Sequence, residues 1–287
     1  MTEKSGEGRE LVVGIDPARD WHMPLAWAAD EAHRRRLRLR LVVAVPPQHD
    51  THRVNGTPHG LALRQVGAQA LEEALNWARA RHPELGLAGE LLGGLPTSVI
   101  GRLSQEARMV VLGSRHLSRT AEYLSAGSLV VPVAAQAACP VVVVGDAEHV
   151  SRQPPYVVVG IDGSESSTAA LAFAYEEADI RGAELRAISV WQAPIFLLQD
   201  EEVALQAQRR MLAEITAGWP QKYPDVVLRH EIPVGHPVEE LARAAEHALS
   251  VVVGRRGRGG YSGMHLGSVV HGLLHRAYCP VITVPGV

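Results

Sequence analysis

The chain has 287 residues, about twice the length of an average domain, so its length alone predicts two domains. Hydrophobic residues make up 46% and charged residues 21%, values typical of soluble globular proteins, which excludes a disordered or fibrous chain. Lys and Arg total 28 against 31 Asp and Glu, a net charge of −3, and this balance argues against nucleic acid as a partner.

The cysteines and the N-terminal segment bear on the compartment. Cys139 and Cys279 each precede a proline and an apolar run, which indicates buried thiols rather than a disulfide or metal framework. Residues 1–10 are polar and charged, without the features of a signal peptide, and no stretch approaches the roughly 18 apolar residues of a membrane span. We expect a cytoplasmic protein with no membrane partner.

The two halves of the sequence repeat the same landmarks in the same order. VVGID at 12–16 recurs at 158–162, and Gly127-Ser128 and Cys139-Pro140 recur as Gly267-Ser268 and Cys279-Pro280. The polar segment 145–155 lacks periodicity and ends in Pro-Pro, as a linker does. We therefore predict one domain at 1–146 and a second at 155–287.

Each half alternates short apolar runs with segments of helical periodicity, the pattern of an α/β domain with a largely parallel sheet. In the first half the predicted strands are 11–15, 39–45, 87–92, 110–112 and 141–144, and in the second they are 157–161, 185–190, 226–232, 251–253 and 281–284. Apolar residues at helical spacing predict helices that begin near residues 25, 97, 130, 238 and 268. Pro237 suits a first helical turn, and Thr97 or Ser98 is the predicted cap of the equivalent helix in the first half.

The segment VVVGRRGRGGYSGMHLGSVV, residues 251–270, carries the most chemical information. A strand leads into a loop with five glycines, and a helix is predicted to begin at Gly267-Ser268. Glycines let backbone N–H groups approach a ligand, and a helix N-terminus favours an anion, so the loop suits a phosphate chain. The alternative is that the loop only connects the strand to the helix and that its three arginines are solvated. Neither a Walker A loop nor a dinucleotide GxGxxG pattern follows a first strand.

Asp162 ends the first strand of the second half. Ligands of open α/β sheets bind beyond the carboxyl ends of the strands, where both Asp162 and the glycine loop are predicted to lie. The two elements are therefore expected to line one crevice. A helix-capping aspartate is the alternative, because Asp, Gly and Ser are ordinary turn residues.

The spacing of Gly254, Gly257 and Gly267-Ser268 resembles the ATP-binding pattern of the universal stress protein family. The opening VVVGIDGS and the closing CPVITVP resemble the first and last strands of that family, and the likeness extends from about Leu11 to Pro285. The two halves together resemble a tandem member. The resemblance implies two Rossmann-like, doubly wound domains, each with a five-stranded, mostly parallel sheet in the order 3-2-1-4-5.

The resemblance also implies the roles of individual residues. Asp162 would lie beside the nucleoside, Val190 would meet adenine through its backbone, and Val253 would pack near the nucleoside. Gly254, Gly257, Gly267, Ser268 and Val269 would surround the ribose and phosphates. Mg²⁺ or Mn²⁺ would accompany the triphosphate, with no metal site formed by the protein alone.

The first half departs from this pattern. Its corresponding positions are Asp16, Val45, Leu112, Gly113, Gly127 and Ser128. Pro17 and Ala18 replace the Gly-Ser pair of the second half, and His116 occupies the second glycine position. Because proline lacks an N–H donor and histidine adds bulk near the phosphates, we expect nucleotide binding to be weakened or lost in this half.

Two groups of histidines and one basic run are the other clusters of charged or metal-binding residue types in the sequence. His271 and His275 lie four apart on the last predicted helix without the glutamate of HExxH, and His49, His52 and His59 fall in a loop, so neither group predicts a metal site. The basic run HRRRLRLR at 33–40 closes the first helix, where cations interact well with the helix dipole, and it is interpreted as a solvated face, with an anion site as the alternative. A catalytic Ser/His/Asp or Cys/His set is not apparent.

The sequence thus predicts an ATP-binding universal stress protein, a nucleotide-responsive regulator of stress or low-energy adaptation. It is expected to be no enzyme, or at most a weak ATPase. The alternatives are a slow ATP hydrolase or phosphotransferase, and an interaction module that binds no nucleotide. The resemblance further implies an edge strand that pairs in a dimer, or between the two halves of one chain, so a homodimer with unknown protein partners is expected.

Overall fold

A computed structural model describes residues 10–46, 58–114, 129–145, 149–192, 201–258 and 266–286. The described residues form two compact units, which divide between residues 145 and 149. This division agrees with the sequence repeat. Among these residues, none of the helices has both the length and the apolar character needed to cross a bilayer.

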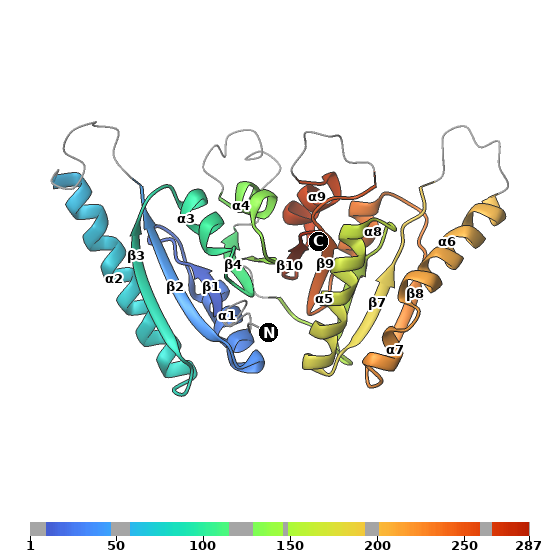
Figure 1. The fold of residues 1–287 in the computed structure, drawn as a ribbon, viewed down its shortest axis with the longest axis horizontal. Helices are drawn as coiled ribbons and strands as arrows, with labels where there is room; N and C mark the ends of the chain where they lie inside the picture. The colour runs from blue at the N-terminus through green and yellow to red at the C-terminus, as the bar shows by residue number, and fades with distance from the viewer. Residues whose placement is uncertain are drawn as a thin grey trace, which may run out of the picture. The chain divides into compact units, whose positions relative to one another are not determined.

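The first domain is a parallel sheet with the strand order β3-β2-β1-β4-β5. Its elements, drawn from blue to green in Figure 1, are β1 (Glu10–Gly14), α1 (His22–Arg35), β2 (Arg38–Val45), α2 (Pro58–Arg81), β3 (Leu87–Gly93), α3 (Pro96–Leu103), β4 (Met109–Ser114), α4 (Val130–Gln136) and β5 (Val141–Gly145).

The second domain repeats this arrangement with the order β8-β7-β6-β9-β10, again with parallel pairs. Its elements are β6 (Tyr156–Gly160), α5 (Glu165–Arg181), β7 (Glu184–Ile188), α6 (Glu201–Thr216), α7 (Trp219–Lys222), β8 (Leu228–Glu231), α8 (Pro237–Ala244), β9 (Ser250–Gly254), α9 (Ser268–Arg276) and β10 (Val281–Val284). The predicted strand order 3-2-1-4-5 is confirmed in both halves.

Burial explains why these segments form strands and helices. The strands that lead into the crevices, β1, β4, β6 and β9, have interiors of buried Val, Leu and Met, as expected of a sheet covered on both faces. On the last helix of each half, Val133 and Ala134 match Leu273 and Leu274, and all four are buried. The predicted equivalence of these two helices is confirmed.

Three local predictions were wrong in detail. Helix α3 begins at Pro96 with Leu95 at its N-cap and no side-chain cap, so Thr97 and Ser98 lie inside the first turn and cap nothing. Strand β7 ends at Ile188, two residues before Val190. Helix α8 ends at Ala244, although apolar spacing continues to Leu249. Apolar periodicity alone does not locate these boundaries.

The fold places one crevice in each domain. In the order 3-2-1-4-5 the second strand is added on one side of the first strand and the fourth strand on the other. The loops after the first and fourth strands therefore lead to opposite faces of the sheet and diverge. Helix α1 packs on α2, and α3 packs on α4, as expected of helix pairs on opposite faces of the sheet. The crevices therefore lie beyond Gly14 and Ser114 in the first domain and beyond Gly160 and Gly254 in the second.

Candidate functional site

Asp162 links the two loops that flank the crevice of the second domain. Its Oδ1 accepts hydrogen bonds from the Ser164 N–H at 3.0 Å and the Ser164 hydroxyl at 2.6 Å. Its Oδ2 accepts a hydrogen bond from the Arg258 N–H at 2.9 Å. The carboxylate therefore connects the turn after β6 to the glycine loop after β9, as the sequence predicted when it placed both at one edge of the sheet.

The environment of Asp162 keeps it ionised. Burial alone raises the pKa of Asp162, but the hydrogen bonds from Ser164 and Arg258 outweigh burial and hold the pKa below the ordinary value of 3.8. Ser164 is also the N-cap of α5, and its Oγ accepts a hydrogen bond from the Ser167 N–H at 3.1 Å. One serine thus orients both the aspartate and the helix that follows it.

Close approach explains two of the loop glycines. A Cβ on Gly254 would lie 2.6 Å from the backbone carbonyl carbon of Ser166, and a Cβ on Gly257 would lie 2.6 Å from Asp162 Oδ2. Both distances are too short for any larger residue to fit without a shift. The sequence predicted close approach at these positions, but to a ligand, whereas the structure shows close approach to the protein's own atoms.

Helix α9 begins where the sequence placed it. Gly267 is its N-cap, and because glycine has no side chain, the N–H groups of the first turn have no side-chain cap. The Gly267 N–H donates to the Arg255 carbonyl at 2.9 Å, which holds the start of α9 beside the loop. Gly257, Gly267, Ser268 and Val269 thereby lie together at the carboxyl edge of the sheet.

The remaining predicted positions of the second domain lie at the ends of strands. Val253 is buried near the end of β9. Val190 lies two residues after the end of β7 and immediately before Trp191, whose bridge to Val234 extends the pairing beyond the strand. The backbone of Val190 therefore lies at the carboxyl edge of the sheet, although the sequence predicted that Val190 would be the last residue of the strand.

Arg258 already contacts the crevice. A Cβ on Gly163 would lie 2.6 Å from Arg258 Nη2 and 2.9 Å from Met211 Sδ, so the guanidinium and the thioether close over the turn after β6. Gly163 has a φ of +78°, which glycine adopts without strain. Of the three loop arginines, Arg256 and Arg258 are exposed, while burial and then the charge of Arg256 lower the pKa of Arg255.

The aspartate of the first domain has different partners. Asp16 Oδ1 accepts a hydrogen bond from the Ala18 N–H at 3.0 Å, and Asp16 Oδ2 pairs with Arg19 Nε at 3.1 Å. Both partners belong to its own turn, whereas Asp162 also binds the loop after the fourth strand. The predicted positions Gly127 and Ser128, like His116, lie outside the described residues.

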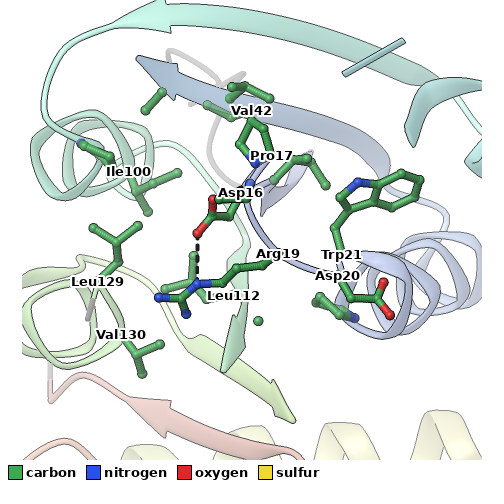
Figure 2. A pocket seen from close by; sticks show the side chains of 18 of the residues that line it. Asp16, Pro17, Arg19, Asp20, Trp21, Val42, Ile100, Leu112, Leu129 and Val130 are labelled. Carbon is green, nitrogen blue, oxygen red and sulfur yellow. Dashed lines mark hydrogen bonds and ion pairs between the residues drawn. The ribbon is translucent and has the colours of Figure 1, made fainter. Parts of the chain in front are cut away.

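A cavity of about 640 Å³ lies at the carboxyl ends of β1, β2 and β4 in the first domain. Four of the six predicted first-domain positions line it: Asp16, Val45, Leu112 and Gly113. Figure 2 shows Asp16 and Arg19 joined within this cavity, with Ile100, Leu129 and Val130 around them. The half with the degenerate loop therefore contains a pocket of ligand size.

A histidine cluster that the sequence analysis did not single out lies elsewhere in the first domain. His33 Nδ1 lies 2.8 Å from a Glu84 oxygen, and His82 Nε2 lies 2.8 Å from Asp30. The two imidazole rings stack at 4.4 Å and 11°. Because a ring nitrogen coordinates in the plane of its ring, parallel stacked rings do not aim at one ion, so this geometry favours an ion-pair network over a metal site. No pattern of spacing marks these residues, which come from separate segments.

The architecture defines a protein with two doubly wound α/β domains and a candidate ligand crevice in each. The family model described as "Universal stress protein family" matches residues 8–145 and 156–285, so the chain belongs to the universal stress protein family as a tandem two-domain member. Membership supports a role in the stress response. The resemblance predicted from the sequence is confirmed.

Curated relatives and solved structures agree with this assignment. The chain is 34% identical over 283 residues to the universal stress protein Rv2005c of Mycobacterium tuberculosis, with 95% of each chain covered. It is 34% identical over 311 residues to the universal stress protein Mb2019 of Mycobacterium bovis, covering 95% of this chain and 93% of the relative. A crystal structure of a universal stress protein from Archaeoglobus fulgidus has the same fold, with a TM-score of 0.74, 18% identity, and 98% and 97% of the two chains covered.

Proposed function

We propose that the second domain binds ATP and that the protein is a nucleotide-responsive regulator of stress or low-energy adaptation. One observation carries the proposal: Asp162, Gly257 and the uncapped start of α9 lie together at the carboxyl edge of the sheet. A helix N-terminus without a side-chain cap offers N–H donors and a favourable dipole to phosphate. The family resemblance supplies the identity of the nucleotide.

The residues present fit a triphosphate. Gly257 lets the loop lie close to Asp162, the hydroxyl of exposed Ser268 is at the start of α9, and Arg256 and Arg258 supply positive charge beside them. Mg²⁺ or Mn²⁺ would be held by phosphate oxygens and water, since hard cations need few protein ligands there. On binding, the phosphates would draw Arg258 away from Gly163, which changes the surface that a partner protein meets.

We further infer that the protein is a switch rather than an efficient enzyme. Asp162 accepts three hydrogen bonds, and its lowered pKa makes it a weak general base. It is therefore poorly suited to activating water, and any ATPase activity should be slow. The proposal includes a cytoplasmic homodimer that acts through protein partners, as the family resemblance implies.

The test is calorimetric titration with Mg²⁺-ATP. Replacing Gly257 with Val places a branched side chain against Asp162 Oδ2, so ATP affinity should fall at least about tenfold, which corresponds to about 1.4 kcal/mol. The matched control is Gly93→Val at the end of β3, where a Cβ would meet nothing within 4 Å, and this variant should bind ATP as the unchanged protein does. Circular dichroism verifies that both variants are folded.

Two results would contradict the proposal. One is an unchanged protein that shows no heat of ATP binding at millimolar nucleotide. The other is a folded Gly257→Val variant that retains full affinity. Rapid ATP hydrolysis by the unchanged protein, lost in an Asp162→Ala variant that still binds ATP, would instead favour the hydrolase alternative.

A further inference from the structure

The cavity of the first domain has apolar walls. Its described lining includes Val42 and Val45 of β2, Leu112 of β4, Ile100 of α3 and Val130 of α4. Figure 2 shows several of these side chains arranged around the Asp16–Arg19 pair. Most of the surface that a ligand would meet is therefore hydrocarbon.

The charges at this cavity do not suit a polyphosphate. Among the described lining residues the charged groups are Asp16, Arg19 and Asp20, so the one cation faces two carboxylates. Arg19 is paired with Asp16 at 3.1 Å, and Asp20 accepts a hydrogen bond from the His22 N–H at 2.9 Å. A triphosphate bound against these described residues would meet net negative charge.

Backbone donors are also scarce beside Asp16. Pro17 has no N–H, and the Ala18 N–H already donates to Asp16 Oδ1 at 3.0 Å. In the second domain the matching turn has glycine and serine. The Ser164 N–H there also donates to its aspartate, so the turn after β1 has one backbone donor fewer than the turn after β6, the one that Pro17 lacks.

The helix beside the cavity exposes apolar side chains toward it. Leu63 and Val66 of α2 line the cavity and remain 38% and 53% exposed. Covering exposed hydrocarbon is favourable by about 25 cal/mol per Å². An uncharged apolar molecule would gain this free energy, and it would not require the cavity to supply positive charge.

We propose that the cavity of the first domain binds an uncharged, largely apolar small molecule and not a nucleoside triphosphate. Its volume of about 640 Å³ lies within the usual range for small-molecule pockets, roughly 300 to 1,000 Å³. This inference goes beyond ATP binding in the second domain, since it assigns a ligand of a different chemical class to the first. The protein then senses two kinds of small molecule with two copies of one fold.

The test uses N-phenyl-1-naphthylamine, an uncharged aromatic fluorophore that brightens in apolar sites, titrated into the full chain. Val66→Glu adds a carboxylate at the cavity wall and should weaken probe binding at least about tenfold, because burying the charge beside apolar walls is costly. Leu61→Glu is the matched control, since Leu61 is on the same helix and 54% exposed but does not line the cavity. Its probe affinity should equal that of the unchanged protein.

Three outcomes would overturn the proposal: no probe binding by the unchanged protein, equal probe affinity in Val66→Glu, or stoichiometric displacement of the probe by Mg²⁺-ATP. The Gly257→Val variant separates this inference from the proposed function. This variant should lose ATP binding and still bind the probe. ATP binding therefore tests the proposed function of the second domain, and probe binding separately tests the inference about the first.

Discussion

Two aspartates at equivalent positions show how one residue can serve two different crevices. Asp162 accepts hydrogen bonds from its own turn and from the Arg258 N–H of the opposite loop. Asp16 accepts from Ala18 and pairs with Arg19, both within its own turn. The carboxylate in the second domain therefore fixes the glycine loop, whereas the described contacts of Asp16 hold only the turn after β1.

The lowered pKa of Asp162 predicts a specific loss of stability in acid. Its pKa lies below 3.8 in the folded protein, so the ionised carboxylate stabilises the fold above that pH, and this contribution is lost as the pH falls through the folded pKa. The free energy of unfolding should thus differ between the unchanged protein and Asp162→Asn by a constant amount near neutrality. The difference should shrink below about pH 4, as urea unfolding at a series of pH values would show.

Ser164→Ala provides the control for this prediction. It removes the hydroxyl that donates to Asp162 Oδ1 at 2.6 Å, so the folded pKa of Asp162 should rise toward its unfolded value, and the acid loss should be smaller and complete at a higher pH. A stability difference between the unchanged protein and Asp162→Asn that is independent of pH would show that these hydrogen bonds do not act on the ionised form.

At the scale of secondary-structure elements, sequence periodicity predicted every strand of both sheets. For the inner strands it succeeded because they are buried on both faces and stand out as apolar runs, whereas the edge strands β3 and β8 are only partly buried. It failed at boundaries, such as the cap of α3 and the end of α8, because capping and neighbouring strands decide where an element ends. It also missed polar groups buried in helices, since a Glu and an Arg four apart usually lie on an exposed face.

Helices α1 and α5 each bury a glutamate that pairs with the arginine one turn later. Glu31 pairs with Arg35, and Glu177 pairs with Arg181, and both glutamates are fully buried. Both pairs occupy the same repeat position, 146 residues apart. The basic run at 33–40, interpreted from the sequence as a solvated face, therefore includes a side chain, Arg35, that is only 4% exposed.

Removing one partner of a buried pair should destabilise the protein far more than removing an exposed one. Glu177→Ala leaves Arg181 without its carboxylate and should cost about 3 kcal/mol of unfolding free energy. Arg209→Ala, in an exposed pair with Glu202, should cost less than about 0.5 kcal/mol. Urea denaturation measures both, and the double change Glu177→Met with Arg181→Met should recover most of the loss. Equal small costs for the two single variants would contradict this account.

At the scale of the whole molecule, the sequence repeat predicted two domains, the spacing of the glycines predicted the family, and comparison of the halves predicted which one carries the intact glycine pattern. It did not reveal the cavity of the first domain. The reason is physical: a cavity depends on how side chains from β2, α2 and α3 meet, and segments far apart in sequence leave no common pattern. The sequence showed that the first half lacks the intact glycine pattern of the phosphate loop, but it did not show the apolar pocket of the same domain.

The unequal crevices predict that one chain binds one ATP. The second domain offers the glycine loop and the start of α9, whereas the described lining of the first cavity has one cation and two carboxylates. Calorimetry or equilibrium dialysis with Mg²⁺-ATP should therefore saturate at one nucleotide per chain, and Gly257→Val should reduce this to none within the same concentration range. Two equivalents of ATP per chain would show that the degenerate turn with Pro17 still accepts a triphosphate. In that case the differences between the two halves would tune affinity and leave the ligand class unchanged.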